Sequence, residues 1–231
     1  VRAVEEGRNV FFNIKKTVSF FLSTNFAEVL SVFLVSLFLW QADFLTSTQL
    51  LWVNLITDSL PVVALGVERT RGAMERPPVS DREIFSPRAI CSMLVFGGML
   101  SAVVLAQFFV FLHVYGNGVA TTAAFLTVSL SELLHVFNVR AEDGKRSFRD
   151  HFSNRALLVT VAVGVVLNVL LVVTPALSIA FRLTPLSAVQ WLWVALCSCA
   201  VLPLGAAYRF VLRKGSVSRR KRRIPLRGSA Q

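Results

Sequence analysis

Three carboxylates each lie inside a different long apolar stretch of the sequence, at Glu28, Asp58 and Glu132. An ionisable side chain at the depth of a bilayer costs about 3 kcal/mol, so packing alone does not explain three of them. A charged partner is therefore expected. Amide and hydroxyl side chains lie close to two of the acids, and their oxygens are hard donors of the kind that bind metal cations. The sequence thus predicts a cation site inside a membrane.

The spacing of these polar residues places them on shared helix faces. Asn25 and Glu28 are three residues apart, and Asn54, Thr57 and Asp58 stand at positions i, i+3 and i+4. Ca²⁺ takes about six to eight oxygen ligands, a number that these residues approach if some carboxylates bind through both oxygens. The predicted metal ligands are Asn25, Glu28, Asn54, Thr57, Asp58 and Glu132. One site can nearly be closed from this chain, whereas a second, around Asn54 and the far side of Asp58, needs ligands from outside it.

Two residues beside the acids predict further features. Pro61 has no N–H for the carbonyl of Thr57, so we expect a kinked helix whose free backbone oxygens line a site or cavity. His135 lies one turn after Glu132, but imidazole suits a hard cation poorly. A helix–helix hydrogen bond or a place beside a proton relay is its favoured role. The alternative for each acid is a protonated or snorkelling side chain that bonds to a neighbouring helix.

Long apolar segments carry these residues. Hydrophobic residues make up 55% of the 231 and charged residues 16%, which is typical of a polytopic membrane protein. The second and fourth segments are the least hydrophobic because they carry the polar residues. We predict an all-α membrane protein, a bundle of six transmembrane helices in a lipid bilayer. Segments that can span roughly 30 Å of hydrocarbon lie at about 17–40, 49–67, 89–115, 119–139, 156–181 and 186–212.

The basic residues predict the topology. Of the 24 lysines and arginines, all except Arg182 lie before or at the start of the first segment, after the second, after the fourth, or at the end of the sixth and beyond. Cytoplasmic loops are enriched in Lys and Arg, so both termini and the loops at about 68–88 and 140–155 are expected in the cytoplasm. The net charge of +11 then reflects topology, and nucleic-acid binding is not expected. The basic tail, residues 213–231, is predicted to be disordered and to contact anionic lipid.

Residues 1–16 place apolar residues at helical spacing among charges and lead into the first segment without a break. We expect a continuous helix whose first part projects as a cytoplasmic stalk. The expected domains are the stalk at 1–16, the transport domain at 17–212 and the tail at 213–231. Residue 1 is Val, and the chain is expected to be part of something longer. The three cysteines predict no disulfide framework, and Gly97, Gly98 and Gly164 predict close helix packing.

The segment 49–61, QLLWVNLITDSLP, resembles the sixth membrane helix of P-type calcium pumps of the sarcoplasmic-reticulum type. Residues 25–29, NFAEV, resemble the ion-binding segment of the fifth helix of that family. Glu132 corresponds by position to the acid of the eighth helix. Further similar parts are EEGR at 5–8 with Asn13 and Lys15 in the stalk, MERPP at 74–78 in the following loop, and residues 186–193 at the start of the tenth helix. The resemblance extends over residues 1–212 and is strongest up to residue 88.

The resemblance implies a role for each predicted ligand. The first calcium site would use Asn25, Glu28, Thr57, Asp58 and Glu132. Asn54 and Asp58 would contribute to the second site, so that Asp58 bridges both. Ser59 departs from the family, which commonly has Gly there, and His135 stands where the family has Asn. The implied mechanism is alternating access, with Glu28 and Glu132 as carriers of counter-transported protons.

The resemblance also implies which parts of a pump this sequence lacks. It has no DKTGT-like phosphorylation sequence, nucleotide-binding domain, actuator loop or PEGLP-like fourth helix. We therefore expect the ion-translocating C-terminal module of a P-type ATPase, a fragment or split subunit that cannot hydrolyse ATP alone. Ca²⁺ is the expected cargo, with Mn²⁺ as a second candidate, and ATP and Mg²⁺ act only through missing domains. The expected partner is the N-terminal part of the pump, with the first four membrane helices and the cytoplasmic domains. The alternatives are an ATP-independent cation channel or exchanger and a degenerate structural membrane protein.

Overall fold

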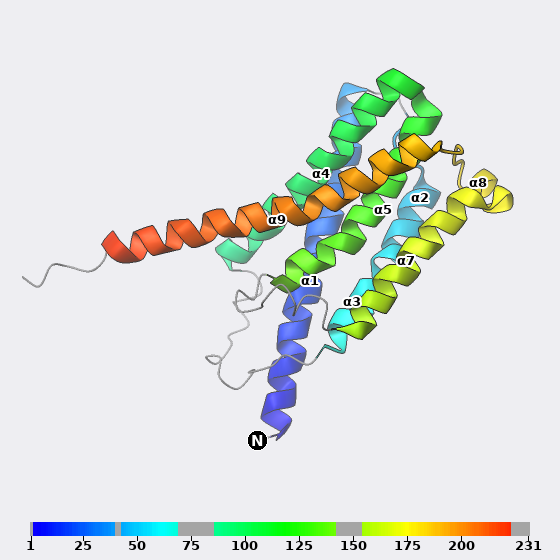
Figure 1. Cartoon of the computed structure of the whole chain (residues 1–231). Helices are drawn as coiled ribbons and strands as arrows, with labels where there is room; N and C mark the ends of the chain where they lie inside the picture. Colours follow the sequence, from blue (N-terminus) through cyan, green and yellow to red (C-terminus); the bar gives the residue numbers. More distant parts are fainter. Residues whose placement is uncertain (1, 40–42, 69–85, 142–153, 223–231) are drawn as a thin grey trace, which may run out of the picture.

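The computed structural model describes residues 2–39, 43–68, 86–141 and 154–222, and these ranges contain helices and short connections but no strand (Figure 1). The elements are α1 (Arg2–Phe38), α2 (Ser47–Trp52), the π-helix η1 (Val53–Thr57), α3 (Ser59–Gly66), α4 (Pro87–Tyr115), α5 (Asn117–Ala141), α7 (Arg155–Val173), α8 (Pro175–Ala180) and α9 (Ala188–Arg222). Within the described ranges, six helical stretches are long and apolar enough to cross a membrane. They are α1, the joined α2–η1–α3, α4, α5, α7 and α9. The predicted fold class and the predicted number of spans are thus confirmed.

Helix α5 forms the centre of the bundle. In its most apolar stretch 83% of the residues are buried, whereas the other five spans bury 22% to 44%. It packs against α1, α4, α7 and α9. The outer helices turn large apolar side chains outward, among them Phe33, which is 60% exposed, and Val63, which is 64% exposed. Such an apolar exterior is suited to lipid. The spans that carry Asp58 and Glu132 are the least hydrophobic of the six, as predicted.

Local sequence signals begin the helices at defined residues. Thr46 and Gln49 form a capping box at α2, because the Thr46 Oγ1 accepts from the Gln49 N–H at 3.3 Å and the Gln49 Oε1 accepts from the Thr46 N–H at 3.0 Å. Ser86 caps α4 and Asn154 caps α7 with the same type of side-chain bond. Gly116, with φ of 83°, joins α4 to α5 in a backbone conformation that suits glycine.

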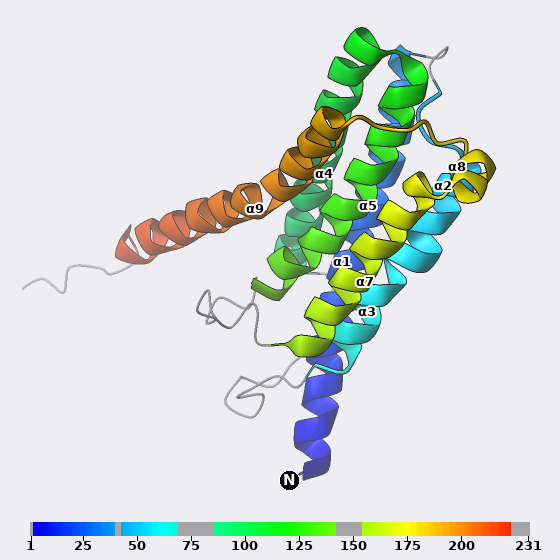
Figure 2. The same ribbon diagram turned by 45° about the vertical axis from the view of Figure 1, so that its right-hand side comes forward.

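Two predicted boundaries are wrong. The fifth span ends at Val173 and not near residue 181, because Thr174 takes an extended conformation before Pro175, which begins α8. The basic tail was predicted to lack structure from residue 213, but α9 continues through Arg222, and its second half projects away from the bundle in both views (Figures 1 and 2). Residues 223–231 lie outside the described residues. Of the predicted loop at 140–155, residues 140 and 141 belong to α5 and residue 155 to α7, and 142–153 lie outside the described residues.

The first helix runs without interruption from Arg2 to Phe38, as predicted for a stalk joined to a span, and its N-terminal part extends beyond the other helices (Figure 1). Its cytoplasmic location stays a prediction. The three cysteines are free, as predicted. A Cβ at Gly97 would lie 2.6 Å from the Ser23 carbonyl oxygen, and one at Gly164 would lie 2.8 Å from a Leu133 methyl carbon, which confirms close packing at both glycines. Gly98 has nothing within 4 Å of such a Cβ, so the prediction is wrong there.

Candidate functional site

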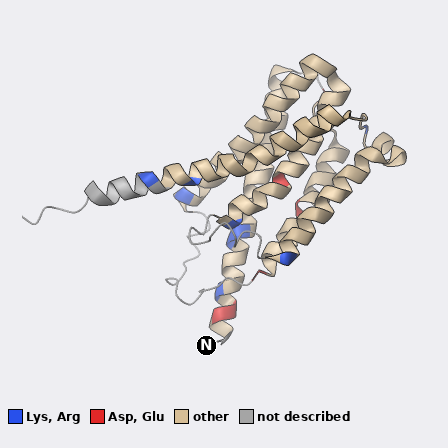
Figure 3. Cartoon of the chain, viewed as in Figure 1, with Lys and Arg blue, Asp and Glu red and all other residues tan. Residues whose placement is uncertain are grey.

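The three intramembrane acids come from different parts of the bundle and are all buried. Glu28 lies on α1, Asp58 lies between η1 and α3, and Glu132 lies on α5. Their exposed fractions are 6%, 0% and 1%. In Figure 3 acidic positions lie partway along the bundle and on the N-terminal part of α1, whereas most basic positions gather toward the end from which α1 and α9 project. The acids are thus held away from the described lysines and arginines at the bundle's end.

Two hydrogen bonds connect α1 to the segment that carries Asp58. The Asn54 Nδ2 donates to Glu28 Oε2 at 2.8 Å and also to the Leu50 carbonyl oxygen at 3.0 Å. The Thr24 Oγ1 donates to Asp58 Oδ2 at 2.9 Å. Glu28 and Asn54, both predicted ligands, are therefore in direct contact. Thr24 was not predicted, although it lies four residues before Glu28, a spacing that also places two side chains on one helix face.

Several oxygens of the predicted ligands are buried without a hydrogen-bond donor from the described residues. They are Glu28 Oε1, Thr57 Oγ1, Asp58 Oδ1 and both carboxylate oxygens of Glu132. If Glu28, Asp58 and Glu132 were ionised together, their charges would repel one another. A buried polar group without a partner costs about 1–3 kcal/mol, and more if it is charged. A bound cation would give these oxygens a partner and offset the repulsion.

The predicted ligands do not all converge on one point. Among the described residues, no group of three His, Cys, Asp or Glu side chains is arranged closely enough to hold a metal ion. A cation would therefore also need amide, hydroxyl or backbone oxygens, as the predicted set includes. Asn25 is partly buried, and its Nδ2 donates to the Phe21 carbonyl oxygen at 2.8 Å, which orients its amide along α1. Glu132 makes no hydrogen bond to the other predicted ligands in the described ranges. The complete ligand set stays a prediction.

The backbone beside Asp58 is wound as a π-helix. The Asp58 N–H donates to the Val53 carbonyl oxygen at 2.9 Å, a bond that spans five residues where an α-helix spans four. The irregular turn therefore begins at Val53, whereas Pro61 was expected to mark the distortion. Pro61 itself lies inside α3 and supplies no N–H to the Thr57 carbonyl. Single π-helical turns within α-helices frequently occur at functional sites.

His135 has the predicted helix–helix role. Its Nε2 lies 2.9 Å from the Ser23 Oγ, which joins α5 to α1. The ring stacks on Phe20 with centroids 6.1 Å apart and lies 5.1 Å from the Phe96 centroid. Its Nε2 is engaged with Ser23 and two aromatic rings lie beside the imidazole, so a role as a metal ligand is again disfavoured.

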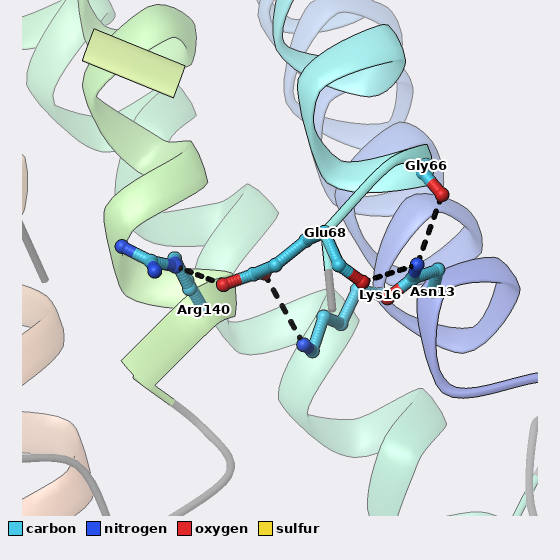
Figure 4. Close-up of polar contacts among 5 residues, drawn as sticks. All are labelled: Asn13, Lys16, Gly66, Glu68 and Arg140. Atoms are coloured by element: carbon cyan, nitrogen blue, oxygen red, sulfur yellow. Dashed lines mark hydrogen bonds and ion pairs between the residues drawn. The ribbon is translucent and has the colours of Figure 1, made fainter. Parts of the chain in front are cut away.

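A buried ion-pair network, which was not predicted from the sequence, lies at one end of these helices (Figure 4). The Arg140 Nε lies 2.7 Å from Glu68 Oε1, and the Lys16 Nζ lies 3.4 Å from Glu68 Oε2. The Asn13 Nδ2 donates to the backbone oxygens of Gly66 and Glu68 at 2.9 and 2.7 Å. All four polar residues of this network are at most 7% exposed. The sequence predicted Lys16 and Arg140 only as basic residues that set the topology, and it gave no sign that either is buried in an ion pair.

The network joins the same helices that carry the acids. Lys16 lies on α1, Glu68 directly follows α3, and Arg140 lies on the last turn of α5. An acid immediately after an apolar span, facing cations at the ends of other spans, was the available sequence signal. The pairing itself could not be derived, because it depends on how three separate helices pack.

Comparison with known proteins gives consistent matches. The family model described as "Cation transporting ATPase, C-terminus" matches residues 43–211. The chain is similar to Calcium-transporting ATPase 1 of Bacillus cereus, with 32% identity over 222 residues that cover 88% of this chain and 25% of the relative. It is also similar to a Calcium-transporting ATPase of Bacillus subtilis, with 32% identity over 225 residues that cover 95% of this chain and 24% of the relative. The chain thus spans about a quarter of the length of these relatives.

Proposed function

Because the chain belongs to the family of cation-transporting ATPase C-terminal regions, we propose that it forms the membrane module through which a P-type pump binds and moves its cation. Six spans long and apolar enough to cross a bilayer make it a multi-pass integral membrane protein. The observation that carries the proposal is the set of buried oxygens, on three carboxylates and one hydroxyl, that no described donor satisfies.

Calcium is the proposed cargo. The two relatives are named calcium-transporting, and the candidate ligands are hard oxygen donors, which Ca²⁺ prefers. Mn²⁺ shares that preference and is the second candidate. One site would use Asn25, Glu28, Thr57, Asp58 and Glu132, and a second would use Asn54 and Asp58. The bond from Asn54 to Glu28 supports a common environment for the two sites, because it joins a ligand of each.

The remainder of the pump is a proposed partner. ATP hydrolysis with Mg²⁺, the first four membrane helices and the cytoplasmic domains would come from the parts of the relatives that this chain does not cover. Movement of the α1 stalk would then shift Glu28 against Asp58 and expose the site alternately to each side. When the cation leaves, protons would replace its charge, with Glu28 and Glu132 as carriers. Calcium transport by the assembled pump without an opposite pH change in sealed vesicles would contradict this proton step.

Calcium binding to the full 231-residue chain tests the site directly. Purified protein in mild detergent is titrated with Ca²⁺ in a calorimeter, for wild type and for Asp58→Asn. The substitution keeps the side-chain volume but removes the charge that would bridge the two sites. We expect at least a tenfold loss of affinity, equivalent to about 1.4 kcal/mol.

Glu6→Gln is the matched control, because it removes one carboxylate from an exposed position of α1. Calcium affinity should stay at the wild-type value in this variant. Far-ultraviolet circular dichroism checks that both variants keep their helix content. Unchanged affinity in Asp58→Asn, or an equal loss in Glu6→Gln, would contradict the assignment of Asp58 to the calcium site. Repeating the titration with Mn²⁺ shows which of the two candidate cations binds with higher affinity.

A further inference from the structure

Two buried polar residues outside the candidate ligand set have oxygens without a partner. Asn168 on α7 is 1% exposed, and its Oδ1 has no hydrogen-bond donor among the described residues. Ser129 on α5 is fully buried, and its Oγ makes no hydrogen bond within the described ranges. The Asn168 Nδ2 donates to the Gly164 carbonyl oxygen at 2.9 Å, which orients the amide along α7. Buried polar groups are almost always paired, so both oxygens need an explanation.

Helices α5 and α7 are antiparallel neighbours, which brings the two residues to the same level of the bundle. Helix α5 runs toward the end from which the α1 stalk projects, and α7 runs back from that end (Figures 1 and 2). They pack closely where a Cβ at Gly164 would lie 2.8 Å from a Leu133 methyl carbon. Asn168 lies four residues after Gly164, and Ser129 lies four residues before Leu133. Four residues turn an α-helix by about 400°, so each side chain stays within about 40° of the contact between the two helices.

The carboxylate of Glu132 continues this row of unpaired oxygens along α5. Glu132 lies three residues after Ser129, a spacing that makes the two side chains neighbours on the helix surface. It is 1% exposed, and neither of its carboxylate oxygens has a donor among the described residues. Helix α7 also packs against α3, which begins directly after Asp58. One amide oxygen, one hydroxyl oxygen and two carboxylate oxygens are therefore buried without a partner on adjoining turns of α5 and α7.

We propose that Asn168 and Ser129 are further ligands of the cation that binds beside Glu132, so that α7 takes part in the site. Amide and hydroxyl oxygens are hard donors, and Ca²⁺ takes about six to eight oxygen ligands. The candidate ligands of the first site approach that number only if some carboxylates bind through both oxygens, and two more oxygens make up the difference. A buried water also bonds such groups, but it would not balance the charge of the Glu132 carboxylate. The inference rests on the proposed function, because it extends the same site.

Calcium titration of the full chain in detergent, as described for Asp58→Asn, tests the proposal with Asn168→Leu. Leucine has the same number of side-chain heavy atoms as asparagine but no oxygen. We expect about a tenfold loss of calcium affinity, the lower end of the effect of removing a group that supports a metal site. Ser129→Ala should also weaken calcium binding. Thr160→Val is the matched control on α7, because its hydroxyl already donates to the Leu157 carbonyl oxygen at 3.0 Å, and its affinity should equal that of wild type.

Unfolding without calcium separates a ligand from a structural residue. The protein is unfolded with increasing dodecyl sulfate in mixed micelles, and helix content is read by circular dichroism. Asn168→Leu removes a buried oxygen that has no donor and loses only a bond within α7, so it should unfold at the same or a higher dodecyl sulfate concentration than wild type. Added Ca²⁺ should raise the midpoint of wild type more than that of Asn168→Leu. A lower midpoint of Asn168→Leu without calcium would assign Asn168 a structural role and overturn the proposal.

The two titrations distinguish this inference from the proposed function. Loss of affinity in Asp58→Asn with wild-type affinity in Asn168→Leu would overturn the inference, leave water as the occupant beside Asn168 and keep the proposed function. Wild-type affinity in both variants would contradict both. An equal loss in Thr160→Val and Asn168→Leu would also overturn the inference, because it would show a general effect of substitutions on α7.

Discussion

Glu68→Gln is expected to destabilise the bundle strongly, because it leaves two buried cations without their shared carboxylate. Glu68 lies 2.7 Å from Arg140 and 3.4 Å from Lys16, and all three side chains are at most 6% exposed. Removing one partner of a buried ion pair costs about 3–5 kcal/mol, whereas an exposed pair contributes about 0–1 kcal/mol. Glutamine keeps an oxygen that can accept one N–H from Arg140. We therefore expect the free energy of unfolding to fall by about 3 kcal/mol, the lower end of the range for a broken buried ion pair.

The measurement is equilibrium unfolding of the full chain in mixed micelles, with increasing dodecyl sulfate and helix content read by circular dichroism. Glu6→Gln removes the same group from an exposed position of the same helix that carries Lys16, and it should change the free energy of unfolding by less than about 0.5 kcal/mol. The difference in free energy of unfolding between these two variants therefore measures the effect of losing a buried, paired carboxylate compared with an exposed one.

A triple replacement tests the physical reason for the loss. With Lys16→Met, Glu68→Leu and Arg140→Met together, no charge stays buried without a partner, and apolar replacement of a whole buried ion-pair network is often neutral or stabilising. The triple variant should therefore be more stable than Glu68→Gln. The assignment of a buried ion-pair network is refuted if Glu68→Gln unfolds at the same dodecyl sulfate concentration as Glu6→Gln. It is also refuted if the triple variant is the least stable of all.

Glycine substitutions give two further predictions, both measured by the same unfolding titration. Gly97→Ala should cost about 1–3 kcal/mol because its Cβ meets the Ser23 carbonyl oxygen at 2.6 Å, whereas Gly98→Ala meets nothing and should be neutral or stabilising by up to about 1 kcal/mol. Equal effects of the two would contradict the close approach of α1 and α4. Gly205→Ala should also lower the free energy of unfolding by about 1–3 kcal/mol, because the new Cβ meets the Asn138 side chain, which donates to the Val201 carbonyl oxygen. An unfolding midpoint equal to that of wild type would show that Asn138 moves freely.

The spans could be predicted from the sequence because their signals are local. Hydropathy over about 20 residues identifies a span whatever its neighbours are, and the capping box at Thr46 and Gln49 begins α2 independently of the bundle. The end of the fifth span was also a local signal, at Thr174 and Pro175, but the apolar residues beyond it suggested a longer helix. The extension of α9 through Arg222 is different, since a run of basic residues has no fixed preference between helix and coil.

The candidate site also has some features that local sequence signals predict and others that they do not. The i, i+3, i+4 spacing of Asn54, Thr57 and Asp58 was visible in the sequence, because neighbours on one helix face follow from helical geometry. The bond from Thr24 to Asp58 spans 34 residues, and the ion pair between Glu68 and Arg140 spans 72. Such contacts depend on the rotation and depth of separate helices, which no local spacing determines. The π-helical turn was missed for a related reason, since one shifted hydrogen bond leaves no periodic signal over five residues.

The described residues bury four acids, and the way each is compensated distinguishes structure from transport. Glu68 is paired with cations that belong to the chain, so its charge is balanced permanently and its role is to hold helices together. Glu28, Asp58 and Glu132 receive at most one hydrogen bond each from an uncharged group and retain oxygens without a donor. A fixed cation at that point would neutralise them permanently and prevent exchange. The proposed function requires acids that release their counter-charge at each transport cycle, and such acids have to be left uncompensated by the protein; the buried oxygens without a donor on Glu28, Asp58 and Glu132 meet that requirement.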